Sequence, residues 1–382
     1  MARIVLIGPA YPLRSGLATF NERLVRAFQE EGHSVVIYSF SLQYPSFLFP
    51  GKTQYSTEAP PENILIKSRI NSINPFNWLE TGRELKRQSP DLIVVRYWLP
   101  FMGACLGTIL RRVRKNKHTR IIAITDNIIP HEKRPGDRLL TRYFLRSCDA
   151  FITMSEKVLQ DLRSLEQTKP ALLVTHPLYD NFGAPVDKQH ARKQLGLPAE
   201  GNILLFFGFI RKYKGLDMLL EALALLKQFP VRLLVAGEFY EEEAPYREQI
   251  RRLGLEDKLI LRTDFIPDSQ VKYYFCAADV VIQPYRNATQ SGVTPLAYHF
   301  EKPMIVTDTG GLPAMVPHEK AGLVCKPVPA SIADAVIRFY ETGEASFIPF
   351  LREEKKKYTW EKLTGNILKL ANETGCDDLT RS

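Results

Sequence analysis

Two basic residues lie in a loop that joins an apolar run to a helical stretch, a position suited to binding phosphate. The apolar run 203–210 is followed by Arg211 and Lys214, and Gly215 precedes the helical stretch 216–228. The N–H groups at the start of a helix and the positive end of its dipole favour an anion. Arg211 and Lys214 would add the formal charge that a diphosphate leaving group requires. The alternative is an ordinary basic surface turn.

A second loop, residues 284–295, leads from another apolar run into a helix. Thr289 or Ser291 can cap that helix. Gly292 would let a phosphate approach the free N–H groups of residues 292–294. A plain helix cap without a ligand is the alternative for this loop.

The loop 8–16 follows the first apolar run of the chain. It does not match GxGxxG, so the usual dinucleotide-binding fingerprint is absent. Pro9 and Pro12 stiffen the loop, and Gly16 can bring the backbone close to a ligand. A simple strand-to-helix connection explains these residues equally well.

Polar side chains also follow the apolar run 121–125. Asp126, Asn127, His131 and Glu132 come after its end. Because groups just past a parallel strand face the ligand-binding edge of the sheet, these four are candidates for binding sugar hydroxyls. A structural role is the alternative for His131, since a lone histidine is more often structural than catalytic.

Short apolar runs alternate with amphipathic stretches along almost the whole chain, which is typical of parallel strands buried on both faces. We predict an α/β fold with two Rossmann-like, doubly wound parallel-sheet domains facing a cleft. The predicted strands are 3–8, 35–40, 92–98, 121–125, 150–154, 171–176, 203–210, 231–237, 259–265, 280–285, 304–308 and 323–326.

Length and the repeat of a strand–glycine–helix unit predict the domain bounds. A chain of 382 residues exceeds what one hydrophobic core usually supports. We expect one domain over 1–180, a second domain over 181–358, and a last segment over 359–382. The linker is expected near 177–198.

The distribution of charge and the cysteine content indicate which partners the protein binds and in which compartment it lies. Residues 1–185 hold 25 Lys and Arg against 16 Asp and Glu, whereas the remainder is balanced at 26 of each. The basic run 111–120 could attract a phosphorylated ligand or an anionic membrane, or it could be a solvated helix end. Five scattered cysteines without a CxxC pair fit a reducing cytosol. We expect a cytoplasmic protein, peripheral at the membrane, that does not bind nucleic acid.

Four segments together resemble glycosyltransferase family 4, a family of retaining enzymes with the GT-B fold. The more specific matches are FGFIRKYKG at 207–215, similar to the family's basic donor loop, and EKPMIVTDTGGLP at 301–313. FITMSE at 151–156 and YTW at 358–360 resemble further elements of the family. The resemblance implies that Arg211 and Lys214 hold the donor diphosphate. It also implies that 1–180 is the acceptor-side domain, that 181–358 is the donor domain, and that a last helix over 359–382 crosses back to the first domain.

The sequence departs from the family pattern at two places. Ala288 and Leu296 stand where the family has two glutamates eight positions apart, so the usual glutamate contacts cannot be carried over. Asp126 stands where many members have a histidine. The loop with Gln290 and Ser291 must therefore supply other donor contacts.

These observations predict an enzyme that moves a sugar from a UDP- or GDP-linked donor to a glycan or lipid-linked saccharide, with retention and without a metal or other cofactor. A non-catalytic nucleotide-sugar or glycan-binding protein is the main alternative, and a nucleotide-binding oxidoreductase is a weaker one. Arg96, Trp98 and the region 47–49 are expected to line the acceptor side or to pack in the core. The predicted catalytic residues are Lys214, Arg211 and Asp126, and the predicted donor-binding residues are Gly16, Gly208, Gln290, Ser291, Gly292, Val293 and Phe265.

Overall fold

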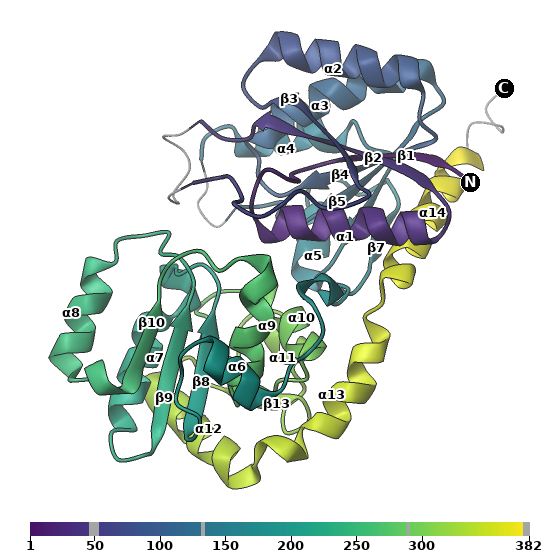
Figure 1. Ribbon diagram of the computed structural model, residues 1–382. Helices are drawn as coiled ribbons and strands as arrows, with labels where there is room; N and C mark the ends of the chain where they lie inside the picture. The colour runs from purple at the N-terminus through teal and green to yellow at the C-terminus, as the bar shows by residue number, and fades with distance from the viewer. Residues whose placement is uncertain (46–52, 131–133, 289–290, 377–382) are drawn as a thin grey trace. The chain divides into compact units, whose positions relative to one another are not determined.

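The computed structural model describes residues 1–45, 53–130, 134–288 and 291–376, and it shows two compact units (Figure 1). Unit 1 consists of Met1–Pro177 and Thr359–Ser382, and unit 2 consists of Leu178–Tyr358. Each unit contains one parallel sheet with helices packed on it, so the predicted α/β fold with two parallel-sheet domains is confirmed.

Unit 1 is built on a seven-stranded sheet in the order β3-β2-β1-β4-β5-β6-β7, with every neighbouring pair parallel. The strand order reverses between β1 and β4, which is the topological switch point of the sheet. The strands are β1 (Arg3–Ile7), β2 (Ser34–Leu42), β3 (Leu65–Asn71), β4 (Leu92–Tyr97), β5 (Arg120–Thr125), β6 (Ala150–Thr153) and β7 (Ala171–Leu173).

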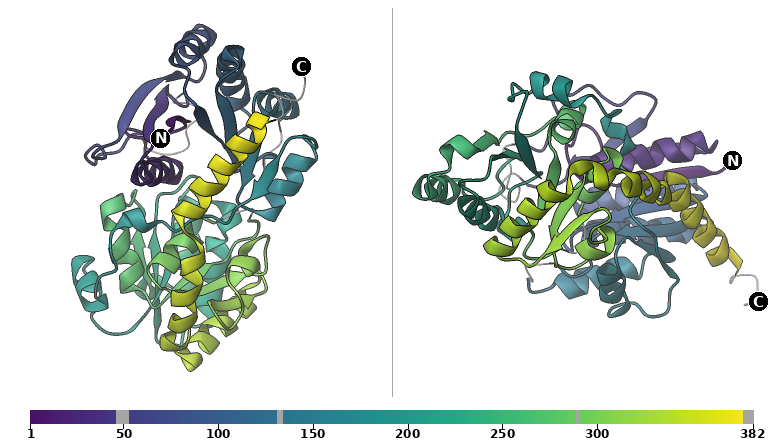
Figure 2. Two further views of the ribbon diagram at one scale, coloured as in Figure 1. Left: turned by 90° about the vertical axis from the view of Figure 1, so that its right-hand side faces the viewer. Right: turned by 90° about the horizontal axis from the view of Figure 1, so that it is seen from below.

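Six α-helices of unit 1 are described. They are α1 (Gly16–Glu30), α2 (Pro75–Gln88), α3 (Met102–Val113), α4 (Asp137–Leu145), α5 (Glu156–Arg163) and α14 (Trp360–Cys376). The last of them, α14, packs against α1 and β5, although it follows unit 2 in the sequence (Figure 2). Ser15 caps α1, because its Oγ accepts a hydrogen bond from the N–H of Ala18 at 3.1 Å.

Unit 2 is built on a six-stranded parallel sheet in the order β10-β9-β8-β11-β12-β13, with its switch point between β8 and β11. The strands are β8 (Asn202–Phe207), β9 (Val231–Ala236), β10 (Leu259–Arg262), β11 (Val280–Gln283), β12 (Met304–Thr307) and β13 (Gly322–Cys325). The α-helices are α6 (Lys188–Gln194), α7 (Leu216–Leu225), α8 (Ala244–Leu253), α9 (Asp268–Ala277), α10 (Val293–His299), α11 (Leu312–Met315), α12 (Pro329–Thr342) and α13 (Ile348–Glu354).

One observed strand was not predicted, and several predicted strands run past the observed ends, by three residues at 171–176, 203–210 and 259–265. β3 was missed, because this edge strand buries only Ile70 fully and lacks a continuous apolar run. The predicted strand 203–210 ends earlier, since Gly208 has a φ of +96° that breaks the extended backbone after β8. Among the residues described, no helix is both long enough and apolar enough to cross a membrane.

Candidate active site

Lys214 lies at the switch point of the unit 2 sheet. It ends the short 3₁₀ turn Lys212–Lys214, which follows β8. A Cβ atom placed on Gly208 would lie 3.0 Å from Lys214 Nζ and 3.8 Å from Val293 Cγ2. The Lys214 ammonium also lies over the ring of Tyr285, 5.6 Å from its centroid. The structure therefore brings Gly208, Lys214 and Val293 together at the carboxyl ends of β8 and β11.

The surroundings of Lys214 weaken its hold on a proton. The side chain as a whole is half-buried, but protein atoms surround its ammonium group. Burial, followed by repulsion from Arg211, lowers the pKa of Lys214 to about 8. An anion placed beside this ammonium would be strongly attracted, because few water molecules compete with it there.

Arg211 is the second cation of the same turn. Its guanidinium carbon lies 5.3 Å from the ring centroid of Tyr240, and Tyr240 in turn stacks on Phe209 with the centroids 4.0 Å apart. The aromatic pair therefore supports the guanidinium, while the side chain remains exposed. Arg211 and Lys214 present two positive charges on a turn of four residues.

The turn is fastened to the loop that follows β11. Gly215 has a φ of +71°, and a Cβ there would lie 2.0 Å from the carbonyl oxygen of Pro284. The N–H of Arg286 donates to the carbonyl oxygen of Tyr213 at 2.7 Å. Only glycine permits so close a backbone approach, so the position of Lys214 depends on contacts between two loops.

The Ser291 hydroxyl forms hydrogen bonds with other residues of unit 2. It donates to Gln283 Oε1 at 2.5 Å and accepts from the N–H of Val293 at 3.2 Å, and Thr294 Oγ1 also donates to Gln283 Oε1 at 3.2 Å. Gly292 has an ordinary helical φ of −69°. The prediction of free N–H groups across residues 292–294 is therefore wrong at Val293. The N-cap of α10 is Gly292, which has no side-chain cap bond, so the predicted cap at Ser291 is also wrong, although Ser291 accepts from the first N–H of the helix. Thr289 and Gln290 lie outside the described residues.

The remaining predicted donor residues lie in different places. Phe265 is half-buried and follows β10, an edge strand separated from β8 by β9. Gly16 belongs to unit 1, where it is the exposed first residue of α1. Neither residue belongs to the turn that carries Lys214.

Asp126 directly follows β5 in unit 1 and forms a bidentate ion pair with Arg96 of β4. Arg96 Nε donates to Asp126 Oδ2 at 2.6 Å, and Arg96 Nη2 donates to Asp126 Oδ1 at 2.5 Å. Burial raises the pKa of Asp126, and the guanidinium opposes that shift. Both carboxylate oxygens thus accept hydrogen bonds from Arg96. From the sequence, Arg96 was expected to line the acceptor side or to pack in the core, without a named partner.

The other predicted acceptor-side residues can be placed in part. Asn127 is half-buried and follows Asp126. Trp98 donates from Nε1 to the Tyr44 hydroxyl at 2.6 Å and packs edge-on against Phe40, so it belongs to the core of unit 1. His131, Glu132 and the region 47–49 lie outside the described residues.

Two family models match the chain, one for each sheet. Glycosyltransferase Family 4 matches residues 14–177, and Glycosyl transferases group 1 matches residues 187–350. The second match contains the turn with Arg211 and Lys214, and the first contains Arg96 and Asp126. This chain is a glycosyltransferase.

Known proteins similar to this glycosyltransferase include two bacterial enzymes and one solved structure. The D-inositol 3-phosphate glycosyltransferase of Corynebacterium urealyticum is 25% identical, over 74% of this chain and 71% of that protein. The putative teichuronic acid biosynthesis glycosyltransferase TuaC of Bacillus subtilis is 22% identical, over 90% of this chain and 94% of that protein. Anabaena HepE (Alr3699), solved in complex with UDP and glucose, shares the fold with a TM-score of 0.70 at 15% identity, covering 97% and 100% of the two chains.

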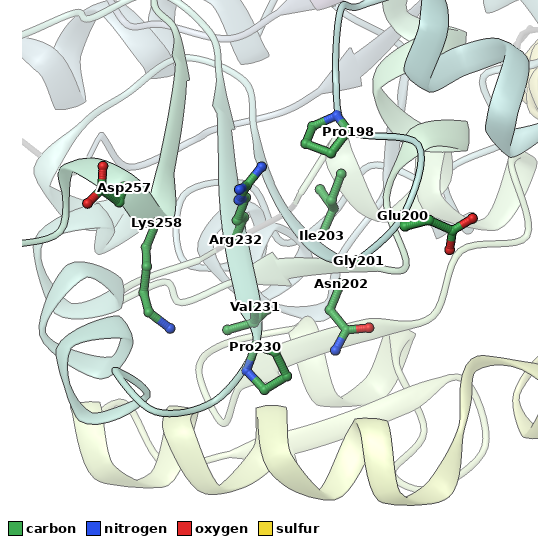
Figure 3. Close-up of a pocket in the computed structure, with 10 residues that line it drawn as sticks. All are labelled: Pro198, Glu200, Gly201, Asn202, Ile203, Pro230, Val231, Arg232, Asp257 and Lys258. Atoms are coloured by element: carbon green, nitrogen blue, oxygen red, sulfur yellow. The ribbon is translucent and has the colours of Figure 1, made fainter.

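A hollow of about 350 Å³ lies at the opposite edge of the unit 2 sheet, at the amino ends of β8 and β9 (Figure 3). Its lining residues are Pro198, Glu200, Gly201, Asn202, Ile203, Pro230, Val231, Arg232, Asp257 and Lys258. The Lys258 ammonium is engaged there, donating to the carbonyl oxygens of Leu226 and Phe229 at 2.8 and 2.7 Å. Since ligands of parallel sheets bind at the carboxyl ends, this hollow is not the active site of the glycosyltransferase.

Three polar residues at the switch points were not among the predicted site residues. Gln283 is the last residue of β11 and joins Ser291 to Thr294. Asn21 of α1 and His176 lie near Arg96 in unit 1. Gln283 could have been predicted, because it is a polar residue at the end of an apolar strand. No feature of the sequence around Asn21 indicates that it belongs to a site.

Proposed function

We propose that this glycosyltransferase uses a nucleotide-diphosphate sugar, UDP- or GDP-linked, and that Arg211 and Lys214 hold the diphosphate. The observation that carries the proposal is the partly desolvated ammonium of Lys214 beside Gly208, at the carboxyl end of β8. HepE, which was solved with UDP and glucose, has a similar fold and supports a nucleotide-sugar as the donor.

In the proposed reaction, the bond between the sugar C1 and the diphosphate oxygen breaks, and negative charge accumulates on the diphosphate. Arg211 and Lys214 stabilise that charge more strongly in the transition state than in the bound donor, because the charge on the bridging oxygen grows during the reaction. Two fixed cations supply the positive charge that a metal ion supplies in other enzymes, so we propose a metal-independent reaction.

The acceptor oxygen forms the new bond to C1 on the face that the diphosphate leaves. Its proton passes to an oxygen of the departing phosphate, and the configuration at C1 is therefore retained. In this scheme no protein side chain acts as the base. That agrees with the state of Asp126, whose two oxygens both accept hydrogen bonds from Arg96.

For the acceptor, we propose a saccharide that is part of a glycan or a lipid-linked intermediate. The names of the relatives point to inositol phosphate in one case and to teichuronic acid, a glycan, in the other. Unit 1 is proposed as the acceptor side, since the excess positive charge of the chain lies within residues 1–185.

We further propose that unit 1 meets an anionic membrane through its helices α2 and α4. Phe76 of α2 is 84% exposed and Leu139 of α4 is 73% exposed, and Arg83, Arg138 and Arg142 on the same two helices are also exposed. Exposed apolar side chains beside cations suit an interfacial contact. Binding to phosphatidylserine vesicles that weakens with rising salt is the expected result, and no binding at low salt would contradict this part.

Lys214→Met tests the role of the turn, because methionine keeps the length of the side chain and removes its charge. The matched control is Lys212→Met, which removes an exposed lysine from the same turn. Thermal-shift titrations with UDP, GDP and their sugar derivatives should first show which nucleotide stabilises the wild type. Lys214→Met is expected to weaken binding of that nucleotide and to slow sugar transfer by about 100-fold, with Lys212→Met near wild type. Transfer by Lys214→Met within about twofold of wild type would refute the proposal.

A further inference from the structure

Unit 1 has a switch point of its own, between β1 and β4, which the proposed diphosphate site does not use. Gly8 directly follows β1, and Arg96 lies near the end of β4. Ligands of open parallel sheets bind outside the carboxyl ends of the strands at such points. The carboxyl ends of β1 and β4, beside Gly8, are therefore a second position at which the chain can bind a ligand.

Arg96 is a buried cation with one unused donor. The residue is only 3% exposed, and the ring of Phe20 lies 4.0 Å from its guanidinium carbon. Two of its nitrogens are paired with Asp126. The third, Nη1, is buried and has no hydrogen-bond partner among the described residues.

Asn21 of α1 contributes the complementary atom. It is 1% exposed, and its Nδ2 donates to the carbonyl oxygen of Pro9 at 2.8 Å, which fixes the orientation of the amide. The other amide atom, Oδ1, is buried and without a partner in the described part of the chain. A Cβ on Gly8 would lie 2.5 Å from Asn21 Nδ2 and 3.2 Å from Arg96 Cβ, so the two side chains flank Gly8.

Leaving both atoms unpaired is unfavourable, since a buried donor or acceptor without a partner costs about 1–3 kcal/mol. The charges around them are balanced. Asp126 neutralises Arg96, and His176 is uncharged near pH 7, because burial, assisted by the positive charge of Arg96, lowers its pKa to about 4. The site therefore offers one donor and one acceptor without net charge.

We infer that Arg96 Nη1 and Asn21 Oδ1 bind hydroxyl groups of a saccharide. A hydroxyl group can accept from Nη1 and can donate to Oδ1, so the hydroxyl groups of a saccharide suit both atoms. A phosphate or carboxylate fits poorly, because Asn21 Oδ1 cannot donate and Asp126 already balances the guanidinium. Asp126 is then a positioning residue that holds Arg96. The inference rests on the proposed function, which supplies saccharides as substrates.

Two sources could provide the hydroxyl groups, a free saccharide or the sugar of the donor, and binding measurements separate them. The first arm titrates the full-length protein with methyl α-glucoside, methyl α-galactoside and methyl α-mannoside, followed by saturation-transfer NMR. The second arm compares UDP-glucose with UDP, and GDP-mannose with GDP, by calorimetry. Each arm is run on the wild type and on the variants.

The test variants are Asn21→Leu and the double variant Arg96→Met/Asp126→Asn. Arg96→Met alone would leave the Asp126 carboxylate as an uncompensated buried charge, which is strongly destabilising. The Asp126→Asn change removes that charge as well, so the double variant should fold. The matched control, Arg114→Met/Asp149→Asn, removes an ion pair of 3.0 Å in unit 1 away from Gly8. The amide oxygen that the Asp149→Asn change introduces can still accept the hydrogen bond that Asp149 Oδ2 accepts from the N–H of Ile121.

If the hydroxyl groups come from a free saccharide, both test variants should bind the glycoside about tenfold more weakly than the wild type. If they come from the donor, both variants should bind the nucleotide-sugar no more tightly than the nucleotide. In either case, the affinity for the nucleotide and the unfolding temperature should stay as in the control. The arm that shows the loss identifies the source of the hydroxyl groups. Unchanged affinities in both arms overturn the inference, as does a wild type that binds the nucleotide but gains nothing from any sugar. A wild type that binds neither UDP nor GDP would instead contradict the proposed function.

Discussion

The ammonium of Lys214 lies over the face of the Tyr285 ring, 5.6 Å from its centroid. Tyr285 is itself buried, and it follows β11, whereas Lys214 follows β8. A cation at the negative face of an aromatic ring is stabilised, but less than by a carboxylate, so the lysine stays available to an anionic ligand. The two central strands of the unit 2 sheet therefore hold the Lys214 ammonium at their carboxyl ends. Among the described residues, no acidic side chain forms an ion pair with it.

The first prediction is that nucleotide binding takes up a proton. The pKa of Lys214 is about 8 in the free protein, and a bound diphosphate raises it. Below pH 8 the lysine is already charged, so its effect on affinity is constant. Above pH 8 the ligand must recruit the proton, and affinity should fall by up to about tenfold per pH unit.

Calorimetry with UDP near pH 9, in buffers that differ in ionisation enthalpy, measures this uptake directly. Lys212→Met should retain it and Lys214→Met should abolish it. Equal heats in all buffers for the wild type would show that Lys214 does not change its protonation on binding.

The second prediction concerns stability. The folded state lowers the pKa of Lys214 below its usual value of 10.5, so the buried charge destabilises the protein fully below pH 8. That penalty disappears as the pH rises from about 8 toward 10.5, because the folded protein then holds the lysine neutral. Lys214→Met should therefore raise the unfolding temperature at pH 7 and lose this advantage near pH 10.5.

Thermal unfolding of Lys214→Met, Lys212→Met and the wild type at several pH values checks this point. Lys212→Met should follow the wild type throughout. If Lys214→Met is less stable than the wild type at pH 7, the packing of the lysine side chain contributes more to stability than its buried charge costs.

Much of the framework could be predicted from sequence, because it depends on local patterns. Apolar runs and the glycines after them marked β1 and β8 and the turn with Lys214. The polar edge strand β3 has no such pattern and was missed. This segment forms a strand because it pairs with β2, while its own composition does not favour one.

The details of the site could not be predicted, because they depend on contacts between distant residues. Lys212 and Lys214 look alike in sequence, yet only the second turns its ammonium toward Gly208. Arg96 interrupts an apolar strand, and its burial is explained by Asp126, thirty positions later. The Ser291 hydroxyl was expected to supply a donor contact, but it donates to Gln283, eight positions earlier in the chain.

The third prediction is that Gly215→Ala disrupts the turn. Alanine at a φ of +71° is strained by about 1–2 kcal/mol, and its Cβ would lie 2.0 Å from the carbonyl oxygen of Pro284. The matched control is Gly196→Ala, where φ is +63° and a Cβ would meet no atom within 4 Å. Thermal unfolding should show a much larger loss for Gly215→Ala, and nucleotide affinity should fall only in that variant. Equal effects would mean that the two loops separate without penalty.

The fourth prediction concerns a partly buried ion network at the amino edge of the unit 2 sheet. Glu344 accepts from Lys302 at 2.8 Å and from Lys188 at 2.5 Å, and Lys188 also bonds to Asp279 at 2.8 Å. Lys302 is buried and donates in addition to the carbonyl oxygen of Ala278. Lys302→Met leaves Glu344 with Lys188 as its remaining cation, and both of these side chains are partly exposed. The loss should therefore lie between that of a surface pair and that of a fully buried pair, at about 2 kcal/mol.

The exposed pair Lys356–Glu353 provides the control, because surface ion pairs contribute about 0–1 kcal/mol. Urea unfolding of Lys302→Met and Lys356→Met, followed by a probe in unit 2, should separate the two by about 1–2 kcal/mol. Nucleotide affinity should stay unchanged in both variants, since the network lies at the edge of the sheet opposite Lys214. Similar stabilities for the two variants would show that Lys188 alone compensates the Glu344 carboxylate.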